Sequence, residues 1–145
     1  MKALVCSACN LIILKDEKPE KCPLCQATKF EKKEDAIHKP GDVTNFTESE
    51  KKHIPSILIA KTCGLIGEGC KDVHVKVGEI VHPMLAEHFI NNIDFYIDKE
   101  FVARQELRPD RIYPAAAIHI KTVGKTLTVI ERCNIHGAWI AEAKF

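Results

Sequence analysis

The sequence predicts an all-β fold in which an immunoglobulin-like β-sandwich follows a small metal-binding module. Apolar and polar residues alternate over 73–77 and again over 93–98, which is the period of a half-buried strand. Several such segments fit into residues 53–145, a usual length for a seven-stranded sandwich. Two Cys-X-X-Cys pairs precede them. We therefore divide the chain into a module (1–35), a linker (36–52) and a sandwich (53–145).

Four thiolates in the module are predicted to bind one metal ion: Cys6, Cys9, Cys22 and Cys25. So short a segment cannot bury enough apolar surface to fold without such an ion. Pro23 and Phe30 make the segment similar to rubredoxin, whose iron carries one electron. We expect iron, with zinc in a purely structural, zinc-ribbon-like site as the alternative. Rubredoxins usually have glycine where this chain has Asn10 and Gln26, and glutamine adopts a left-handed backbone less readily than asparagine.

The segment from Lys32 to Lys52 is polar and charged, with Pro40-Gly41 in its middle, and is typical of a linker. A lone histidine in such a segment is usually solvated. We therefore expect His38 to be exposed to solvent and not to bind a metal.

The predicted strands of the sandwich follow in order. The apolar positions of 73–77 and 93–97 are expected to face its core, and the stretch 118–120 to meet 127–129 across a turn at 124–125. Trp139 begins a final strand. His74 and His119 each lie between apolar neighbours, so their side chains should point to the surface.

Composition indicates a folded protein of the cytoplasm. There is no apolar run long enough for a membrane span, and Met1–Val5 does not lead into a signal sequence. A net charge of +1 with mixed signs argues against a nucleic-acid partner. In a reducing compartment Cys63 and Cys70, which flank the glycine-rich turn 64–69, are expected to be free thiols, with a disulfide across the hairpin as the alternative.

A second predicted metal set combines imidazoles with one thiolate. Prolines, glycines or segment ends adjoin its four histidines, which places them on loops that a sandwich can gather at one end. A structural zinc takes four ligands, whereas this set suits an iron that keeps a coordination position free for a substrate. The five residues are His53, His82, His88, Cys133 and His136. Met84 is interpreted as a packing residue, because five better ligands are present.

The motifs carrying these residues resemble the superoxide reductase family of desulfoferrodoxins and neelaredoxins. They are His53-Ile54-Pro55, the string 78–84 with His88, and the string 133–139, in the family's order. The resemblance implies a β-sandwich with a non-haem Fe²⁺/Fe³⁺ centre, the four histidines as equatorial ligands and Cys133 as the axial one. It also implies reduction of superoxide to hydrogen peroxide without oxygen release, a role in oxidative stress, an electron donor such as rubredoxin, and a homodimer or higher homo-oligomer.

One family position differs in this chain. The family's Glu-Lys-His-X-Pro appears as Lys51-Lys52-His53-Ile54-Pro55, so the glutamate that closes the vacant position of the oxidised iron is missing. Glu50 is one residue away, and in an extended segment it would point to the other side, so we do not transfer the role. Lys52 matches the family's lysine and is predicted to be catalytic, attracting superoxide and organising a proton-donating water. The alternative is a solvated pair of lysines.

Two other functions remain open at this stage. The missing glutamate is compatible with a non-catalytic, iron-binding electron carrier that uses the rubredoxin-like module. The site could also act as a dismutase, which would yield half as much peroxide per superoxide. The module itself is interpreted as an electron relay or as a structural and dimer-forming unit.

Overall fold

The computed structural model describes residues 1–121 and 124–145. In this part of the chain it contains ten strands and one short helix. The N-terminal strands form a small antiparallel sheet in the order β2 (Ile12–Ile13), β1 (Ala3–Cys6), β3 (Phe30–Lys33). None of the described helices is both long and apolar enough to cross a bilayer.

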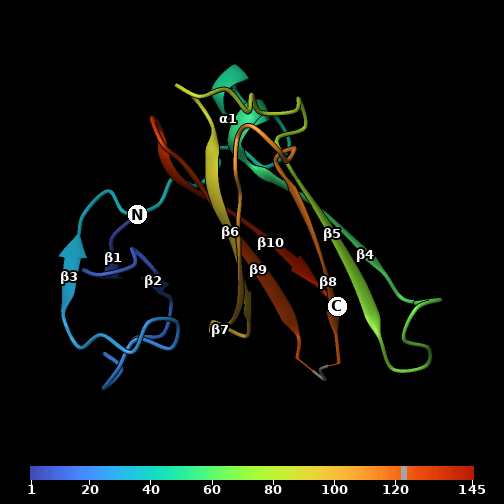
Figure 1. The fold of residues 1–145 in the computed structure, drawn as a ribbon, viewed down its shortest axis with the longest axis horizontal. Coiled ribbons are helices and arrows are strands. Elements are labelled where there is room, and N and C mark those ends of the chain that lie inside the picture. The colour runs from blue at the N-terminus through green and yellow to red at the C-terminus, as the bar shows by residue number, and fades with distance from the viewer. Residues whose placement is uncertain (122–123) are drawn as a thin grey trace.

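Two further sheets face each other as a sandwich (Figure 1). One has the order β10 (Gly137–Lys144), β9 (Thr126–Cys133), β6 (Ile90–Ile97), β7 (Glu100–Glu106). The other has the order β4 (Pro55–Ala60), β5 (Lys71–Val77), β8 (Ala115–Ile120). Every pairing within them is antiparallel. The predicted all-β sandwich is therefore confirmed.

The core of the sandwich uses the predicted alternating positions. Val73, Val75 and Val77 are buried against Ile93 and Phe95 of the opposite sheet. One detail of the predicted order is wrong: 118–120 and 127–129 do not form a hairpin, because β8 pairs with β5 whereas β9 pairs with β6 and β10. Alternation shows that a strand buries one face, but it does not show which strand lies beside it.

The N-terminal sheet packs on the outer face of the four-stranded sheet, at the left of Figure 1. Leu11 and Ile12 are buried against Tyr96, whose hydroxyl donates a hydrogen bond to the Ile12 carbonyl at 2.8 Å. The Arg104 guanidinium also reaches across, donating to the Cys9 carbonyl at 2.7 Å. These contacts fix the module against the sandwich.

The predicted linker is partly ordered. Ile37 is buried, and His38 exchanges backbone hydrogen bonds with β10, donating to the Ala138 carbonyl at 2.8 Å and accepting from Ile140 at 3.2 Å. The His38 side chain is exposed, as expected, and its ring lies 4.6 Å from that of Trp139. A helix, α1 (Glu48–His53), forms where the segment meets β4.

Candidate metal centres

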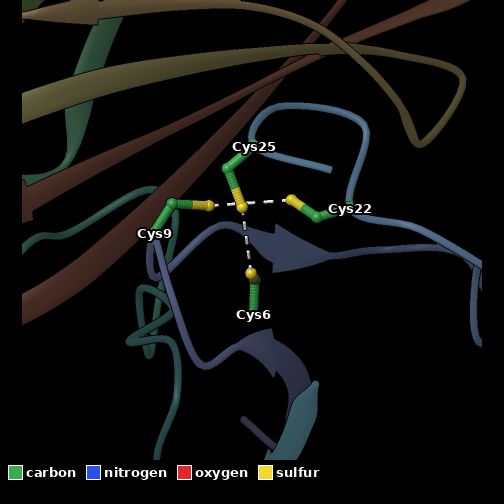
Figure 2. A group of neighbouring side chains, drawn as sticks. All are labelled: Cys6, Cys9, Cys22 and Cys25. Carbon is green, nitrogen blue, oxygen red and sulfur yellow. Dashed lines mark hydrogen bonds between the residues drawn. The ribbon is translucent and has the colours of Figure 1, made fainter. Parts of the chain in front are cut away.

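The four cysteines of the module meet at one point (Figure 2). The Sγ atoms of Cys6 and Cys25 are 3.6 Å apart, as are those of Cys9 and Cys22. Around a tetrahedral ion with metal–sulfur bonds of about 2.3 Å, two sulfurs lie about 3.8 Å apart. The cluster therefore fits one thiolate-bound ion, and iron and zinc both accept such a site.

Both Cys-X-X-Cys turns have the same backbone geometry. The N–H of Asn10 donates to the Cys6 carbonyl and that of Gln26 to the Cys22 carbonyl, each at 3.0 Å. Asn10 has φ 61° and Gln26 has φ 68°, so glutamine adopts the left-handed conformation here as asparagine does. Burial raises the pKa of Cys6, but backbone N–H groups of Cys9 and Ala8 lower it to about 7, whereas burial leaves the pKa of Cys9 and of Cys22 raised. A bound cation is therefore needed to hold all four side chains as thiolates.

Helix α1 presents the first histidine of the second set. Thr47 caps the helix, and its side chain accepts from the Glu50 N–H at 3.2 Å while the Glu50 carboxylate accepts from the Thr47 N–H at 2.7 Å. This reciprocal capping box stabilises a helix of only six residues. His53 lies in its last turn, with Nδ1 2.8 Å from the Ser49 carbonyl, so the ring is fixed with Nε2 free.

The helix also corrects the expectation about Glu50. The segment around it is helical and not extended, because the capping box starts a helix that continues to His53; only Ile54, the residue before Pro55, is extended. The Glu50 carboxylate accepts from Thr47 and, at 2.8 Å, from the Gly41 N–H. Glu50 is therefore engaged as a cap, which supports leaving the family glutamate's role untransferred.

His82 reaches the site through a tight loop after β5. The Ile80 N–H donates to the Lys51 carbonyl at 3.0 Å, which ties this loop to the end of α1. Gly78 has φ +82°, and a Cβ there would lie 2.6 Å from the Lys52 carbonyl oxygen and would collide with that of Ile80. Only glycine permits this close approach. His82 Nδ1 is 2.8 Å from the Pro83 carbonyl.

Cys133 and His136 come from the turn that joins β9 to β10. The turn closes on Gly137, whose φ of +76° completes a three-residue hairpin loop. The Asn134 side chain joins this loop to the one that carries His88: its Oδ1 accepts from the Phe89 N–H at 2.9 Å, and its Nδ2 donates to the Glu87 carbonyl at 3.1 Å. The sequence reading did not assign this role to Asn134.

The four imidazoles form a closed ring of neighbours. Adjacent rings are nearly perpendicular, with interplanar angles between 66° and 82°. Centroid distances are 4.8 Å for His53–His82, 4.6 Å for His82–His88, 5.1 Å for His88–His136 and 4.9 Å for His136–His53. Ligand atoms of His53, His88, Cys133 and His136 lie within 4.8 Å of one another. His82 completes the ring between His53 and His88, opposite His136.

The unpaired Nε2 atoms of these histidines fit a metal ion. The Nε2 atoms of His53, His82 and His88 are buried and have no hydrogen-bond partner among the described residues. Buried polar atoms are normally paired, so three orphans in one cluster indicate a missing ligand. Burial lowers the pKa of His53 and takes that of His82 to about 4, so both rings are neutral at pH 7, as ligands must be.

The Cys133 thiol lies against the same cluster of four imidazoles. Cys133 Sγ is 3.6 Å from His136 Nδ1 and accepts from the His136 N–H at 3.4 Å. Burial raises the pKa of Cys133, while the backbone N–H groups of His136 and Ile135 lower it. The structure thus brings all five predicted ligands together.

Trp139 packs against two of the predicted ligands, His53 and His136. Its ring stacks on His53 at a centroid distance of 4.7 Å and an interplanar angle of 18°, and its Nε1 donates to the His136 carbonyl at 3.2 Å. The sequence reading assigned it only to a strand. Lys52, predicted to be catalytic, directly precedes His53 and has an exposed side chain. Met84 packs on the core as expected.

Comparisons with known proteins agree with this geometry. The desulfoferrodoxin family model matches residues 45–142. A desulfoferrodoxin of Clostridium acetobutylicum is 33% identical over 101 residues, covering 69% of this chain and 70% of the relative. A desulfoferrodoxin homolog of Archaeoglobus fulgidus is 35% identical over 98 residues, covering 68% of each chain. The structure of a superoxide reductase from Nanoarchaeum equitans, 30% identical, superposes with a TM-score of 0.56 over 66% of this chain and 94% of that one.

The family match spans all five residues of the second metal set and begins after the N-terminal module. The resemblance drawn from the motifs is therefore confirmed, and the chain belongs to the desulfoferrodoxin family.

Proposed function

We propose that this chain is a superoxide reductase, an oxidoreductase that adds one electron and two protons to superoxide and releases hydrogen peroxide without oxygen. One observation carries the proposal: the four imidazoles form a closed cluster in which three Nε2 atoms are buried and have no hydrogen-bond partner among the described residues. The Cys133 thiol lies beside this cluster. Iron held by this set supplies a one-electron couple with one coordination position left for substrate.

The chain's own residues prepare the site for that couple. His53 and His82 are held with Nδ1 at backbone carbonyls, which fixes their tautomer and leaves Nε2 to bind metal. Four neutral imidazoles and one thiolate around Fe²⁺ give a formal charge of +1, which attracts an anion to the open side. The N–H groups that contact Cys133 Sγ hold the thiolate in place and set its donor strength.

Lys52 is proposed to guide the substrate. Lys52 directly precedes the ligand His53, and its side chain is exposed and has no side-chain partner among the interactions described for residues 1–121 and 124–145. A free cation there raises the local concentration of superoxide and can hold a water that donates a proton. Lys51, in contrast, pairs with Glu48 at 3.1 Å on the helix surface.

The remaining parts of the proposal concern partners and the module. We assign Cys6, Cys9, Cys22 and Cys25 to a second iron, with zinc as the alternative, and an external one-electron donor such as rubredoxin to the reduction of the catalytic iron. Residues 1–35 dock through a buried apolar face, which favours a fixed relay or structural unit over a freely tethered one. A homodimer and a cytoplasmic location stay predictions.

The test is rapid mixing of anaerobic, iron-loaded ferrous protein with a small excess of superoxide, counting peroxide formed per iron oxidised. One peroxide per iron oxidised, with no oxygen beyond that from spontaneous dismutation of the excess superoxide in a protein-free control, supports the proposal. Catalysed oxygen release, with half a peroxide per superoxide consumed, would identify a dismutase. No oxidation faster than that by air would leave an electron carrier as the better description.

Lys52→Met sharpens the same test, with Lys71→Met as the control. The charges that line a cleft together accelerate association by about 10- to 1,000-fold at low salt. We expect the rate constant of Lys52→Met to fall by up to about tenfold, with a weaker salt dependence than that of the parent protein. Equal rates and salt slopes in both variants would remove Lys52 from the catalytic assignment.

A further inference from the structure

We propose a third metal site, for a zinc-class divalent cation, formed by Cys63, Cys70 and His119, toward which the Asp72 carboxylate would shift to supply the fourth ligand. This site goes beyond the superoxide chemistry and does not depend on it. It lies at the opposite end of the sandwich from α1, beside the hairpin 61–70 that joins β4 to β5 in the lower right of Figure 1. The six residues of β4 alone separate the two ends by about 20 Å.

The fold brings these residues together from two separate segments. Cys63 and Cys70 lie at the two ends of the hairpin turn, and both are buried although the turn between them is exposed. Asp72 in β5 is the direct cross-strand partner of His119 in β8, so their side chains share the outer face of that sheet. The Sγ atoms of both cysteines contact the His119 ring.

The distances match coordination better than hydrogen bonding. His119 Nδ1 is 3.3 Å from Cys63 Sγ and 3.4 Å from Cys70 Sγ. The Nδ1 of a neutral imidazole has a single lone pair or a single hydrogen, so it cannot make a full hydrogen bond to both sulfurs. Around a tetrahedral zinc, a sulfur and a nitrogen lie about 3.5 Å apart. The corresponding contact between Cys133 and His136 in the catalytic cluster is 3.6 Å.

Asp72 lies next to the three ligand atoms of this cluster. Its Oδ1 is buried and accepts no well-formed hydrogen bond from any described residue. The atom lies 3.9 Å from His119 Nδ1 and forms an ion pair with His74 Nε2 at 3.0 Å. A buried carboxylate oxygen is stabilised by a nearby cation, and an ion held by Cys63, Cys70 and His119 would provide one.

The ligand chemistry selects the class of metal. Two thiolates, one imidazole and one carboxylate are a donor set for Zn²⁺, which prefers four tetrahedral ligands of sulfur and nitrogen with oxygen tolerated. All four positions are then filled by protein, so the site would be structural. The ion would link the hairpin 61–70 to β8 and hold the two together.

The experiment compares the metal content of full-length, reduced protein with that of variants after incubation with Zn²⁺ and gel filtration. His119→Ala and the double variant Cys63→Ser/Cys70→Ser should each carry one zinc ion per chain fewer than the parent protein. Leu65→Ser, an exposed change in the same hairpin, is the matched control and should keep that ion. The absorption of the catalytic iron, measured in parallel, confirms that each variant is folded.

Two results would overturn the site. Equal zinc content in the parent and in His119→Ala would show that no ion is bound there. A Cys63–Cys70 disulfide found by mass spectrometry in freshly reduced, zinc-treated protein would show that the thiols pair with each other instead. Asp72→Asn tests the fourth ligand: weaker retention of that zinc against a chelator supports Asp72, and unchanged retention contradicts its part in the set.

Discussion

The N-terminal module and the catalytic end of the sandwich both gather metal ligands, but they do so over different lengths of chain. The four cysteines come from residues 6–25, and each Cys-X-X-Cys turn supplies two of them with its own backbone hydrogen bond. The second set spans residues 53–136 and depends on a helix, a glycine loop and a strand turn meeting at one point. The first site is encoded locally, and the second is a product of the fold.

The difference extends to what each site can do. Four thiolates around one ion leave no position for a substrate, so the module can carry an electron or hold structure. Four imidazoles and one thiolate leave a position open, so chemistry belongs at the sandwich. Changes in the sandwich should therefore affect both metal binding and activity, whereas changes in the module should leave the first reaction with superoxide intact.

The largest effect is expected from His82→Ala. The variant removes one corner of the imidazole ring and should lower the affinity for the catalytic iron by more than the roughly 10- to 100-fold that follows loss of an outer-shell partner. Iron content and peroxide formation should fall together. His74→Ala, an exposed histidine of the same sandwich outside the ring, is the matched control and should leave both unchanged. A full iron content in His82→Ala would contradict the assignment.

Gly78→Ala should weaken the contact between the end of α1 and the loop that carries His82. The new Cβ would clash with the Lys52 and Ile80 carbonyls at a positive φ, which costs about 1–3 kcal/mol of unfolding free energy. Urea denaturation measures this loss, and iron retention should fall as well. Gly64→Ala is the control, since no atom lies within 4 Å of a Cβ built there. Equal stability of the two variants would mean that the loop adjusts freely.

Thr47→Ala tests whether the short helix depends on its cap. Loss of the side-chain hydrogen bond to the Glu50 N–H should lower the free energy of unfolding by about 1 kcal/mol. Thr44→Ala, whose hydroxyl bonds only to the exposed Asp42, should cost less. Denaturant titration of both variants decides the point, and a larger loss in Thr44→Ala would contradict the role of the cap.

The smallest effect is a pH dependence from the same helix. Backbone N–H groups of Thr47 and Gly41 lower the pKa of Glu50 below its usual 4.5. Because the folded pKa is the lower one, the stabilisation is complete above about pH 4.5 and disappears as the pH falls through the folded value. The difference in stability between the parent protein and Glu50→Gln should therefore shrink between pH 6 and pH 3. A difference that grows on acidification would refute the argument.

Features that depend on neighbouring residues could be predicted from the sequence. The alternation of apolar and polar residues predicted the buried faces of β5 and β6. The ligand motifs predicted residues that the structure brings together. The signal for α1 was also local, since Thr47 and Glu50 form a capping box three residues apart, and it was overlooked.

Features that depend on distant pairing could not be predicted in this way. Alternation correctly placed His119 on the surface, but only the register of β5 with β8 puts it beside Asp72 and in contact with Cys63. The separation of β8 and β9 into different sheets has the same origin. Which strands become neighbours is decided by packing of the whole sandwich.

The most direct test of the comparison is a single-turnover reaction of superoxide with the ferrous parent protein and with Cys22→Ser, which lacks one ligand of the module. Both samples must first show the same content and absorption of the catalytic iron. The account predicts the same rate of iron oxidation and one peroxide per iron in both, because the chemistry belongs to the open site of the sandwich. Loss of the reaction in Cys22→Ser with its catalytic iron intact would contradict that claim.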